Sequence, residues 1–213
     1  MPFFILLLAL NAIVATASAA SPFAALSVTA YGEQVFDIAT GVTTLPGGGE
    51  VIDANTGVTV SAAFLRIEEG VLIEGTDIEA SGEFGYLRAG SMEIDIVRGT
   101  FLAKQELLLV REELNVVSSR VEYLAEPAIV RFLGEVTGTT PTFEAQAVLL
   151  DLLTGNVLLV GPYRYEEPLF TLASSEEGAL LELIARDIEG DLVYDAASEV
   201  SGELMERLRG YLP

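Results

Sequence analysis

Cysteine, histidine and tryptophan are absent from the 213-residue chain, and its only lysine is Lys104. Without histidine or cysteine the chain cannot form a Ser-His-Asp triad, a thiol nucleophile, a disulfide, or an imidazole or thiolate zinc site. Its 32 acidic residues outnumber 11 basic ones and give a net charge of -21. Because phosphate binding depends on clustered Lys and Arg, this charge argues against a nucleic-acid partner. Carboxylate chemistry, calcium binding or a non-catalytic role remain.

The N-terminus carries an apolar run from Phe3 to Val14, followed by small residues and an Ala17-Ser18-Ala19 pattern. This layout is typical of a secretory signal peptide and predicts cleavage after Ala19. A retained membrane anchor is the alternative, because the run extended to Ala20 approaches the roughly 18–20 residues of a span. Either way, the rest of the chain is expected outside the cytoplasm.

Five segments repeat one pattern, in which an apolar stretch, a turn and a second apolar stretch follow each other. Each unit is too short to bury an apolar face alone, so neighbouring units must stack and share a core. Short runs rich in Val, Ile, Leu, Phe and Tyr favour strands. The sequence therefore predicts an elongated all-β body of stacked strand pairs, with a sandwich lacking true repeats as the alternative. The predicted turn residues, 28 or 29 apart, are Gly41, Gly70, Gly99, Pro127 and Gly155.

Two apolar columns follow from this repeat and are expected to face inward. By default such columns are core residues; alternatively they line a slot. Three residues before the turns stand Ile38, Ile67, Ile96, Leu124 and Leu152. Two residues after the later turns stand Leu72, Phe101, Ile129 and Val157.

Residues 174–213 show a different pattern, which predicts a helical C-terminal tail after a β domain spanning 25–173. Ser174 and Glu177 form a capping box, and the apolar residues from Leu180 to Ile188 have helical spacing. A second helix is expected from about Asp195. This tail is predicted to cap the last β unit, and a partner-binding helix pair is the alternative.

Candidate chemistry is limited to carboxylates. Asp37, Asp95 and Asp151 share the position four residues before the turn. That position adjoins an inward column, so alternation predicts that these side chains face solvent rather than a catalytic cleft. The stretch from Asp53 to Gly57 resembles part of a calcium loop, but it lacks the later ligands, and a turn explains it equally well. The sequence therefore predicts no enzyme activity, no cofactor and no metal site.

Three units carry a resemblance to a known family: AGSMEIDIVRGTF from Ala89, VEYLAEPAIVRFLGEV from Val121 and AQAVLLDLLTGNVLLVG from Ala145. Each combines a small opening residue or an apolar-acidic-apolar strand with a turn and a second apolar strand. Over about residues 35–167 the chain resembles the LptA/OstA-like family of periplasmic lipopolysaccharide-transport proteins. The resemblance implies a folded-over β-sheet, a β-jelly roll or β-taco, that holds acyl chains between its leaves.

The resemblance also implies partners: an acyl lipid or lipopolysaccharide-like glycolipid, and other envelope β-jelly-roll proteins joined by edge-strand pairing in a bridge to the outer membrane. The nine column residues would then line a lipid slot. Two features depart from the family pattern, namely the acidic charge and a C-terminal tail that is expected to cap the edge strand and stop polymerisation. A rigid envelope scaffold is the alternative function, and a carboxylate hydrolase is a third hypothesis.

Overall fold

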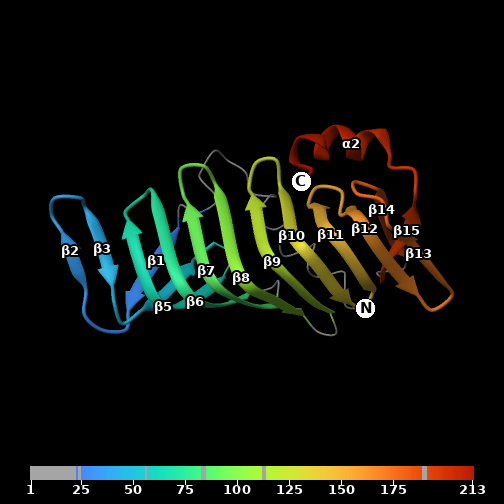
Figure 1. The fold of residues 1–213 in the computed structure, drawn as a ribbon. Coiled ribbons are helices and arrows are strands. Elements are labelled where there is room, and N and C mark those ends of the chain that lie inside the picture. The colour runs from blue at the N-terminus through green and yellow to red at the C-terminus, as the bar shows by residue number, and fades with distance from the viewer. Residues whose placement is uncertain (1–22, 24, 56, 83–84, 112–113, 189–190) are drawn as a thin grey trace.

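The computed structural model describes residues 23, 25–55, 57–82, 85–111, 114–188 and 191–213. Within these residues, fifteen strands form one antiparallel sheet, followed by the short helix α2 (Gly202–Leu208) and the 3-10 turn η1 (Arg209–Tyr211). The sheet is elongated, with β2 at one end and β15 and α2 at the other (Figure 1). The prediction of an elongated all-β fold with a short helical appendage is confirmed.

The strands follow one another in space nearly as they do in sequence, since β4 to β12 pair in chain order. At the N-terminal end β1 pairs with β4, while β2 pairs with β3 and β3 with β5. Their bounds are β1 Leu26–Ala30, β2 Val35–Asp37, β3 Val42–Leu45, β4 Gly49–Asp53, β5 Thr59–Glu68, β6 Leu72–Gly82, β7 Gly85–Asp95, β8 Thr100–Arg111, β9 Leu114–Leu124, β10 Ile129–Thr139, β11 Thr142–Asp151, β12 Val157–Glu167, β13 Phe170–Ser174, β14 Leu180–Ile188 and β15 Asp191–Ala197.

The long strands are interrupted near their middles, and these interruptions fold the sheet lengthwise. Asp77, Gln105 and Glu135 have positive φ values of 51°, 67° and 51°. The pairing register shifts at the same level in neighbouring strands, for example between Lys104 and Leu107. Such bulges bend a strand and increase its twist. Because they are aligned across the sheet, the strands fold into two leaves.

The upper leaf carries the repeat turns, which lie along the top of Figure 1. It comprises residues 65–68, 72–76, 91–95, 100–104, 120–124, 129–133, 147–151 and 157–160, with β2, β3 and β14. The lower leaf comprises the other halves of the same strands, with β1, β4 and β13.

The repeat turns use left-handed backbone where the sequence places glycine. Gly41, Gly70, Gly99 and Gly155 have φ values of 72°, 72°, 66° and 79°. In the fourth unit the left-handed residue is Ala128, at φ 67°, rather than its neighbour Pro127. The predicted turn is therefore one residue early in this unit, which changes the facing of the residues counted from it.

The first predicted C-terminal helix is replaced by strands. Ser174 caps a turn by accepting a hydrogen bond from the backbone N–H of Glu176 at 3.3 Å, and β14 begins at Leu180. The upper half of β12 offers an unpaired edge, and β14 pairs with it from Leu180 to Leu183. Tertiary pairing with this edge outweighs helical spacing, because strand formation depends mainly on context.

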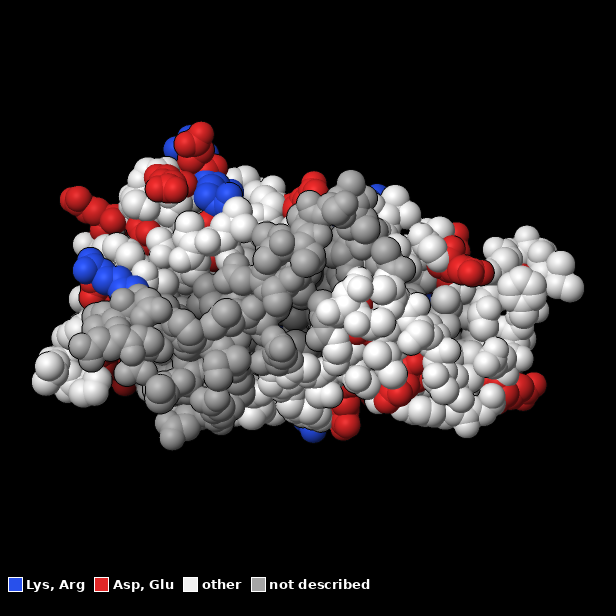
Figure 2. Space-filling model, turned by 180° about the vertical axis from the view of Figure 1, so that it is seen from behind, with Lys and Arg blue, Asp and Glu red and all other residues white. Residues whose placement is uncertain are grey.

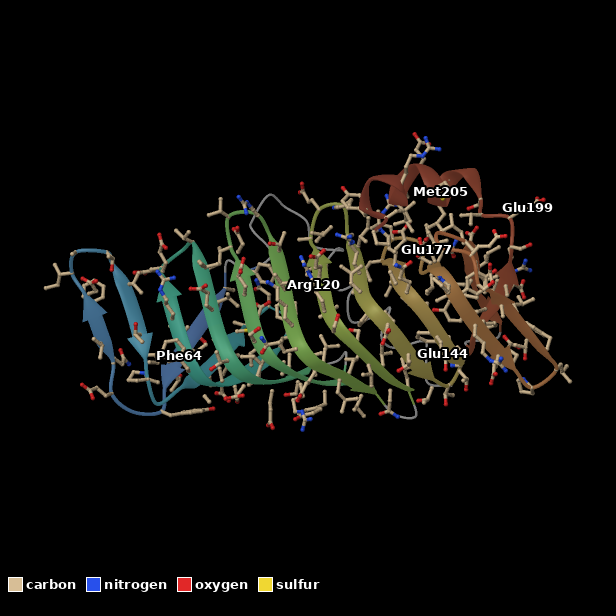
Figure 3. All side chains as sticks on the ribbon, viewed as in Figure 1. Phe64, Arg120, Glu144, Glu177, Glu199 and Met205 are labelled. Carbon is tan, nitrogen blue, oxygen red and sulfur yellow. The ribbon has the colours of Figure 1, made fainter. Side chains whose placement is uncertain are left out.

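The second predicted helix is confirmed in a shorter form, α2, with Ser201 as its N-cap. It lies on the outer side of the upper leaf, above β10 to β12 (Figure 3 labels Met205 on it). Leu204 and Leu208 are buried there in a second apolar cluster with Ile129, Leu149 and Leu158. The helix α2 therefore covers the outer face of the last repeat units. The edge of the sheet is extended rather than capped, because β14 pairs with β12 and β15 becomes the new edge strand.

Candidate functional site

The two leaves enclose a continuous apolar interior, built from side chains that face each other across neighbouring strands. Strand alternation sends every second residue inward. The row nearest the repeat turns is Ile67, Ile73, Ile94, Phe101, Tyr123, Val130, Leu150, Val157 and Leu183. The row nearest the bend is Leu65, Gly75, Met92, Ala103, Val121, Phe132, Val148, Leu159 and Leu181.

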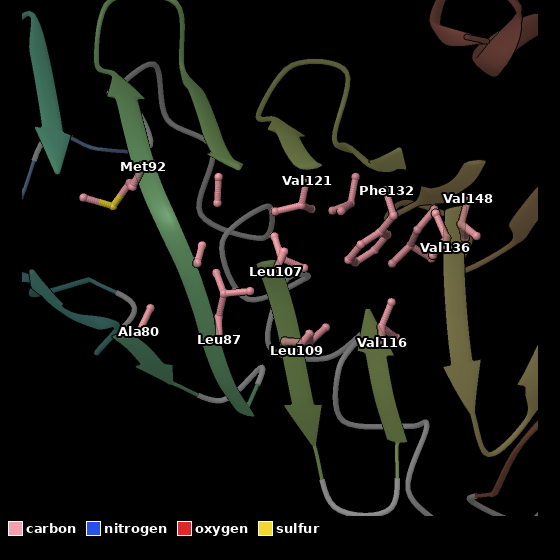
Figure 4. Close-up of a cluster of buried hydrophobic side chains, with 14 of the residues drawn as sticks. Ala80, Leu87, Met92, Leu107, Leu109, Val116, Val121, Phe132, Val136 and Val148 are labelled. Carbon is pink, nitrogen blue, oxygen red and sulfur yellow. The ribbon is translucent and has the colours of Figure 1, made fainter. Parts of the chain in front are cut away.

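The lower leaf supplies matching rows that face the upper ones. One of them runs through Val60, Ala80, Leu87, Leu109, Val116, Gly138, Phe143, Tyr165 and Leu172. Figure 4 shows how the leaves meet, with Leu107 and Val136 of the lower leaf near Val121 and Phe132 of the upper leaf. The interior side chains form one cluster, in which every buried member is 8% exposed or less.

The buried charged residues of the described chain are Asp53, Asp151 and Glu182. Asp53 shares the buried face of β4 with Val51, but it is the last residue of that strand and accepts a turn hydrogen bond there. Asp151 and Glu182 are buried, but they lie on the outer side with α2 and have their own partners there. Removing apolar surface from water is favourable by about 25 cal/mol per Å², whereas an unpaired buried charge is strongly unfavourable. The interior therefore suits hydrocarbon and excludes ionic groups.

The sheet is open along one side. In the described part of the chain, no ladder pair joins the turn-bearing rims of the two leaves to each other. Away from the bend, apolar side chains are what holds the leaves together. Separating the rims therefore exposes apolar surface without breaking a recorded strand pair. Phe23, ahead of β1, adds to this packing, with its ring edge-on to Tyr123 at a centroid distance of 6.5 Å.

The size of the inward side chains changes along the interior, from one end of the sheet to the other. Between β5 and β8 the inward positions include small residues at Ala62, Gly75, Ala80, Ala89 and Ala103. From β10 onward they include aromatic rings at Phe132, Phe143, Tyr163, Tyr165 and Tyr194. The Phe143 ring occupies the space that a side chain at Gly138 would need, since an added Cβ would lie 2.1 Å from it. The C-terminal half is thus filled by rings.

Five of the nine predicted slot residues lie in or against this interior cluster: Ile67, Ile96, Phe101, Leu152 and Val157. The other four do not line it. Ile38 is 88% exposed in the first turn. Leu72, Leu124 and Ile129 lie on the outer face, in register with Asp95, Thr100 and Asp151.

A one-residue error explains these three outward residues. Because side chains alternate along a strand, counting from a position one residue off exchanges the two faces. The fourth turn is centred on Ala128 rather than Pro127, which makes Val130 the inward residue instead of Ile129. The loop between Glu68 and Leu72 is one residue shorter than the loop between Asp95 and Thr100, which makes Ile73 inward instead of Leu72.

Sequence reasoning missed the lower-leaf rows altogether. Their signal is nonetheless present as apolar residues two positions apart, such as Val60 and Ala62, Ile78 and Ala80, or Leu87 and Ala89. These pairs stand on the far side of each bulge from the repeat turns, so counting from the turns does not reach them.

The aspartates of the repeat stabilise turns. Asp37, Asp95 and Asp151 accept hydrogen bonds through Oδ1 from the backbone N–H groups of Ala39, Arg98 and Leu153, at 2.8, 2.8 and 3.0 Å. The N–H of Ala39, with further help from Thr40, holds the pKa of Asp37 below its usual range.

The same turn chemistry is found at the calcium-loop candidate. Asp53 Oδ1 accepts from the N–H of Asn55 at 2.9 Å, and the N–H of Gly57 donates to the carbonyl of Asp53 at 2.8 Å. No cluster of three acidic residues suited to a metal ion is found in the described part of the chain. This turn is therefore accounted for without a cation.

Among the charged side chains visible on the face in Figure 2, acidic ones predominate over basic ones. Ion pairs bridge neighbouring strands, with Arg66 Nη1 to Glu74 Oε2 at 2.5 Å and Arg131 Nη1 to Glu122 Oε2 at 2.7 Å. A shallow cavity of about 310 Å³ is lined by this first pair, by Lys104 and by Glu93. Its two basic and two acidic side chains balance each other. The cavity therefore does not reduce the repulsion between the acidic protein and an anionic head group.

None of the helices in the described part of the chain has the length and hydrophobicity that a membrane span needs. Comparison with protein-family models and with curated proteins gives no match. Among solved structures, the chain is similar to LptH from Pseudomonas aeruginosa, the LptA-homologous periplasmic component of its lipopolysaccharide transport device. The similarity has a TM-score of 0.42 and 10% sequence identity, and it covers 49% of this chain and 79% of LptH.

Proposed function

We propose that this chain is an exported lipid-binding protein of the periplasm or cell envelope that holds acyl chains between its two leaves. The observation that carries the proposal is the continuous apolar interior of a sheet in which no described strand pair joins the rims of the two leaves. Each CH₂ group moved from water into such an interior contributes about 0.8 kcal/mol. The free energy gained by burying a lipid tail thus compensates for the side-chain contacts between the leaves that the tail replaces.

Entry of a chain requires the rims to separate, which exchanges side-chain contacts for contacts with the lipid. The half between β5 and β8 is the better suited to this exchange. Its small inward residues, Ala62, Ala80 and Ala103, present the least side-chain volume to an entering acyl chain once the leaves part. Because both sets of contacts are apolar, the exchange has a small net cost in free energy.

The lipid is proposed to be an envelope glycolipid, such as one of the lipopolysaccharide type, with its head group outside the seam. A phosphorylated head group would be repelled by the net charge of -21 unless divalent cations bridge it to surface carboxylates. Binding of an anionic glycolipid is therefore expected to increase with Mg²⁺ or Ca²⁺, while binding of an uncharged lipid is not.

The N-terminal end is proposed to pair with other envelope β-jelly-roll proteins and so form part of a bridge to the outer membrane. In the described part of the chain, β2 pairs only with β3, which leaves its other edge unpaired. Val35 and Phe36 on β2 are exposed. An unpaired apolar edge is a template for adding a strand from another chain.

Native mass spectrometry of residues 20–213, purified from an envelope extract in mild detergent, tests the proposal. The same sample is compared after delipidation, with its thermal stability measured in parallel. A stoichiometric lipid adduct whose removal lowers stability supports lipid carriage, because a ligand that binds only the folded state stabilises it. A bare protein with unchanged stability after the same treatment contradicts it.

A rigid envelope scaffold is the second candidate, and the close packing of the interior favours it. Interior residues such as Leu107, Val136 and Leu159 are completely buried, as in a permanently closed core. In that case the sheet serves as a spacer and its edges as contact surfaces. The mass-spectrometric comparison separates the two functions, since a scaffold yields a discrete monomer or oligomer with no adduct.

A further inference from the structure

The interior ends differently at its two extremities, and the C-terminal end is closed. At β12 the leaves part, because its upper half pairs with β14 from Val157 to Val160 while its lower half pairs with β13 from Tyr163 to Glu167. β14 then continues into a hairpin with β15 (Figure 1). This hairpin extends the upper leaf beyond the last repeat unit.

Tyr165 and Tyr194 bring the two leaves together at this point. Tyr165 is the inward residue of the lower half of β12 and is 1% exposed. Tyr194 stands on β15 and packs against the same interior cluster as Tyr165, together with its neighbour Ala196. The extension of the upper leaf thus supplies a ring that packs at the end of the lower leaf.

Burial of the two rings supports this geometry. Burial is the main cause of the raised pKa of each phenol, and proximity to Tyr165 raises the pKa of Tyr194 further. The Tyr165 hydroxyl donates a hydrogen bond to Glu167 Oε1 at 2.6 Å, which fixes its ring. Leu181 and Leu183 of β14 are buried beside them in the same cluster.

We infer that Tyr165 and Tyr194 form an end wall that stops an acyl chain at the C-terminal end and so sets the longest chain the interior accepts. The inference rests on the proposed lipid function. Chains enter at the half lined by small residues, and the longest of them displace the rings of Phe132 and Phe143 before they reach the wall. The methyl end of the acyl chain therefore does not pass beyond β15. Transfer of the lipid to a partner occurs through the open side of the sheet or at the β2 end.

The experiment measures binding of lysophosphatidylcholines with saturated chains from decanoyl to eicosanoyl to residues 20–213, by displacement of a fluorescent fatty-acid probe. This head group has no net charge, so the acidic surface affects all chain lengths alike. For the wild type, affinity is expected to rise about fourfold for each CH₂ group and then to level off at a limiting length. In Tyr194→Ala, the levelling is expected at a longer chain.

Two variants separate the wall from general loss of packing. Tyr194→Phe keeps the ring, and its limiting length should equal that of the wild type. Tyr123→Ala removes a ring from the middle of the interior and should lower affinity at every length without moving the limit. If Tyr194→Ala fails to fold, Tyr194→Leu keeps an apolar but shorter side chain and should lengthen the limit less.

The outcomes distinguish the wall from the function it depends on. A wild type that binds no chain of any length overturns both the lipid function and the wall. A wild type that binds chains without a limiting length overturns the wall alone, as does a limit that is the same in Tyr194→Ala and Tyr194→Leu as in the wild type. A limit that lengthens in these two variants and stays fixed in Tyr123→Ala supports it.

Discussion

The first and last repeat units of this sheet are the same kind of strand-turn-strand hairpin, yet their outer side chains differ greatly in exposure to water. On the N-terminal hairpin, Phe36 is 61% exposed, and the next turn exposes Ile38. On the last repeat unit the outward residues Leu149 and Leu158 are fully buried, because α2 covers them. The outer face of the last repeat unit is thus shielded from water, whereas the apolar edge strand β2 is bare, and an uncovered apolar edge invites pairing with another chain.

The covered end also contains the buried ionic contacts of the molecule's C-terminal region. Arg207 on α2 forms a two-pronged pair with Asp151, with Nε to Oδ2 at 2.6 Å and Nη2 to Oδ1 at 2.8 Å. Glu182 on β14 accepts from the N–H of Ser201 at 2.7 Å and from Asn156 Nδ2 at 3.0 Å. These bonds fix α2 in one position on the sheet, whereas the exposed side chains of β2 have apolar character and little packing.

The largest effect is expected from removing Arg207. Asp151 is completely buried, so Arg207→Ala leaves an uncompensated carboxylate beneath α2. Breaking a buried pair in this way typically costs about 3–5 kcal/mol of folding free energy. Urea unfolding should show this loss, and the double variant Arg207→Met with Asp151→Leu should recover most of it. Equal instability of the double variant would show that helix packing, not the pair, accounts for the loss.

A slightly smaller loss is expected from Leu208→Ala on the same helix. Leu208 is 0% exposed in the cluster beneath α2. Truncating such a residue removes buried methyl groups and leaves a cavity, at about 2–5 kcal/mol. Glu206→Ala on the exposed side of the helix is the matched control and should change the unfolding free energy by less than about 0.5 kcal/mol. Similar values for both variants would mean that α2 is not docked on the sheet.

The contrast between the ends was only partly predictable from the sequence. The repeat predicts the stacked hairpins because Gly41, Gly70, Gly99 and Gly155 mark the turns directly. It does not predict the facing of Ile129, because Pro127 next to Ala128 hides the true turn position by one residue. The hairpin from Leu180 onward has helical spacing, and its strand state depends on the free edge of β12, which no local pattern records.

The interior is predictable to a similar degree. Columns counted from the turns reach inward residues such as Phe101 and Val157. The lower leaf is not predicted in this way, because each bulge changes the face to which the following residues point. Rows through Leu87 or Phe143 therefore cannot be found by counting from the turns. No periodicity in the sequence predicts the position of Tyr194, because that position at the end of the interior depends on a hairpin that folds next to Tyr165.

Alkaline pH should destabilise the covered end selectively. Burial raises the pKa of Tyr165 and Tyr194 above the ordinary value of 10.0, so the folded state favours the neutral phenols. Below pH 10 these two groups therefore do not reduce the free energy of unfolding. Above pH 10 it falls by about 1.4 kcal/mol per pH unit for each tyrosine. Urea titrations between neutral pH and high pH should show a shallower fall in Tyr194→Phe. An identical fall in this variant and the wild type would contradict burial of Tyr194.

The smallest effect on stability, and a large effect on association, is expected at the bare end. Phe36→Lys places a charge on the edge strand β2, where the ring is largely in water, so the unfolding free energy should change by less than about 0.5 kcal/mol. A lysine on an edge strand opposes the addition of another strand. Crosslinking in an envelope extract should therefore lose β2-dependent products in Phe36→Lys. They should persist in Leu169→Lys, which changes an even more solvent-exposed apolar residue in the turn beside β13. Loss in both variants would mean that general surface charge matters rather than the β2 edge, and the two ends of the sheet would then not differ in their capacity to pair.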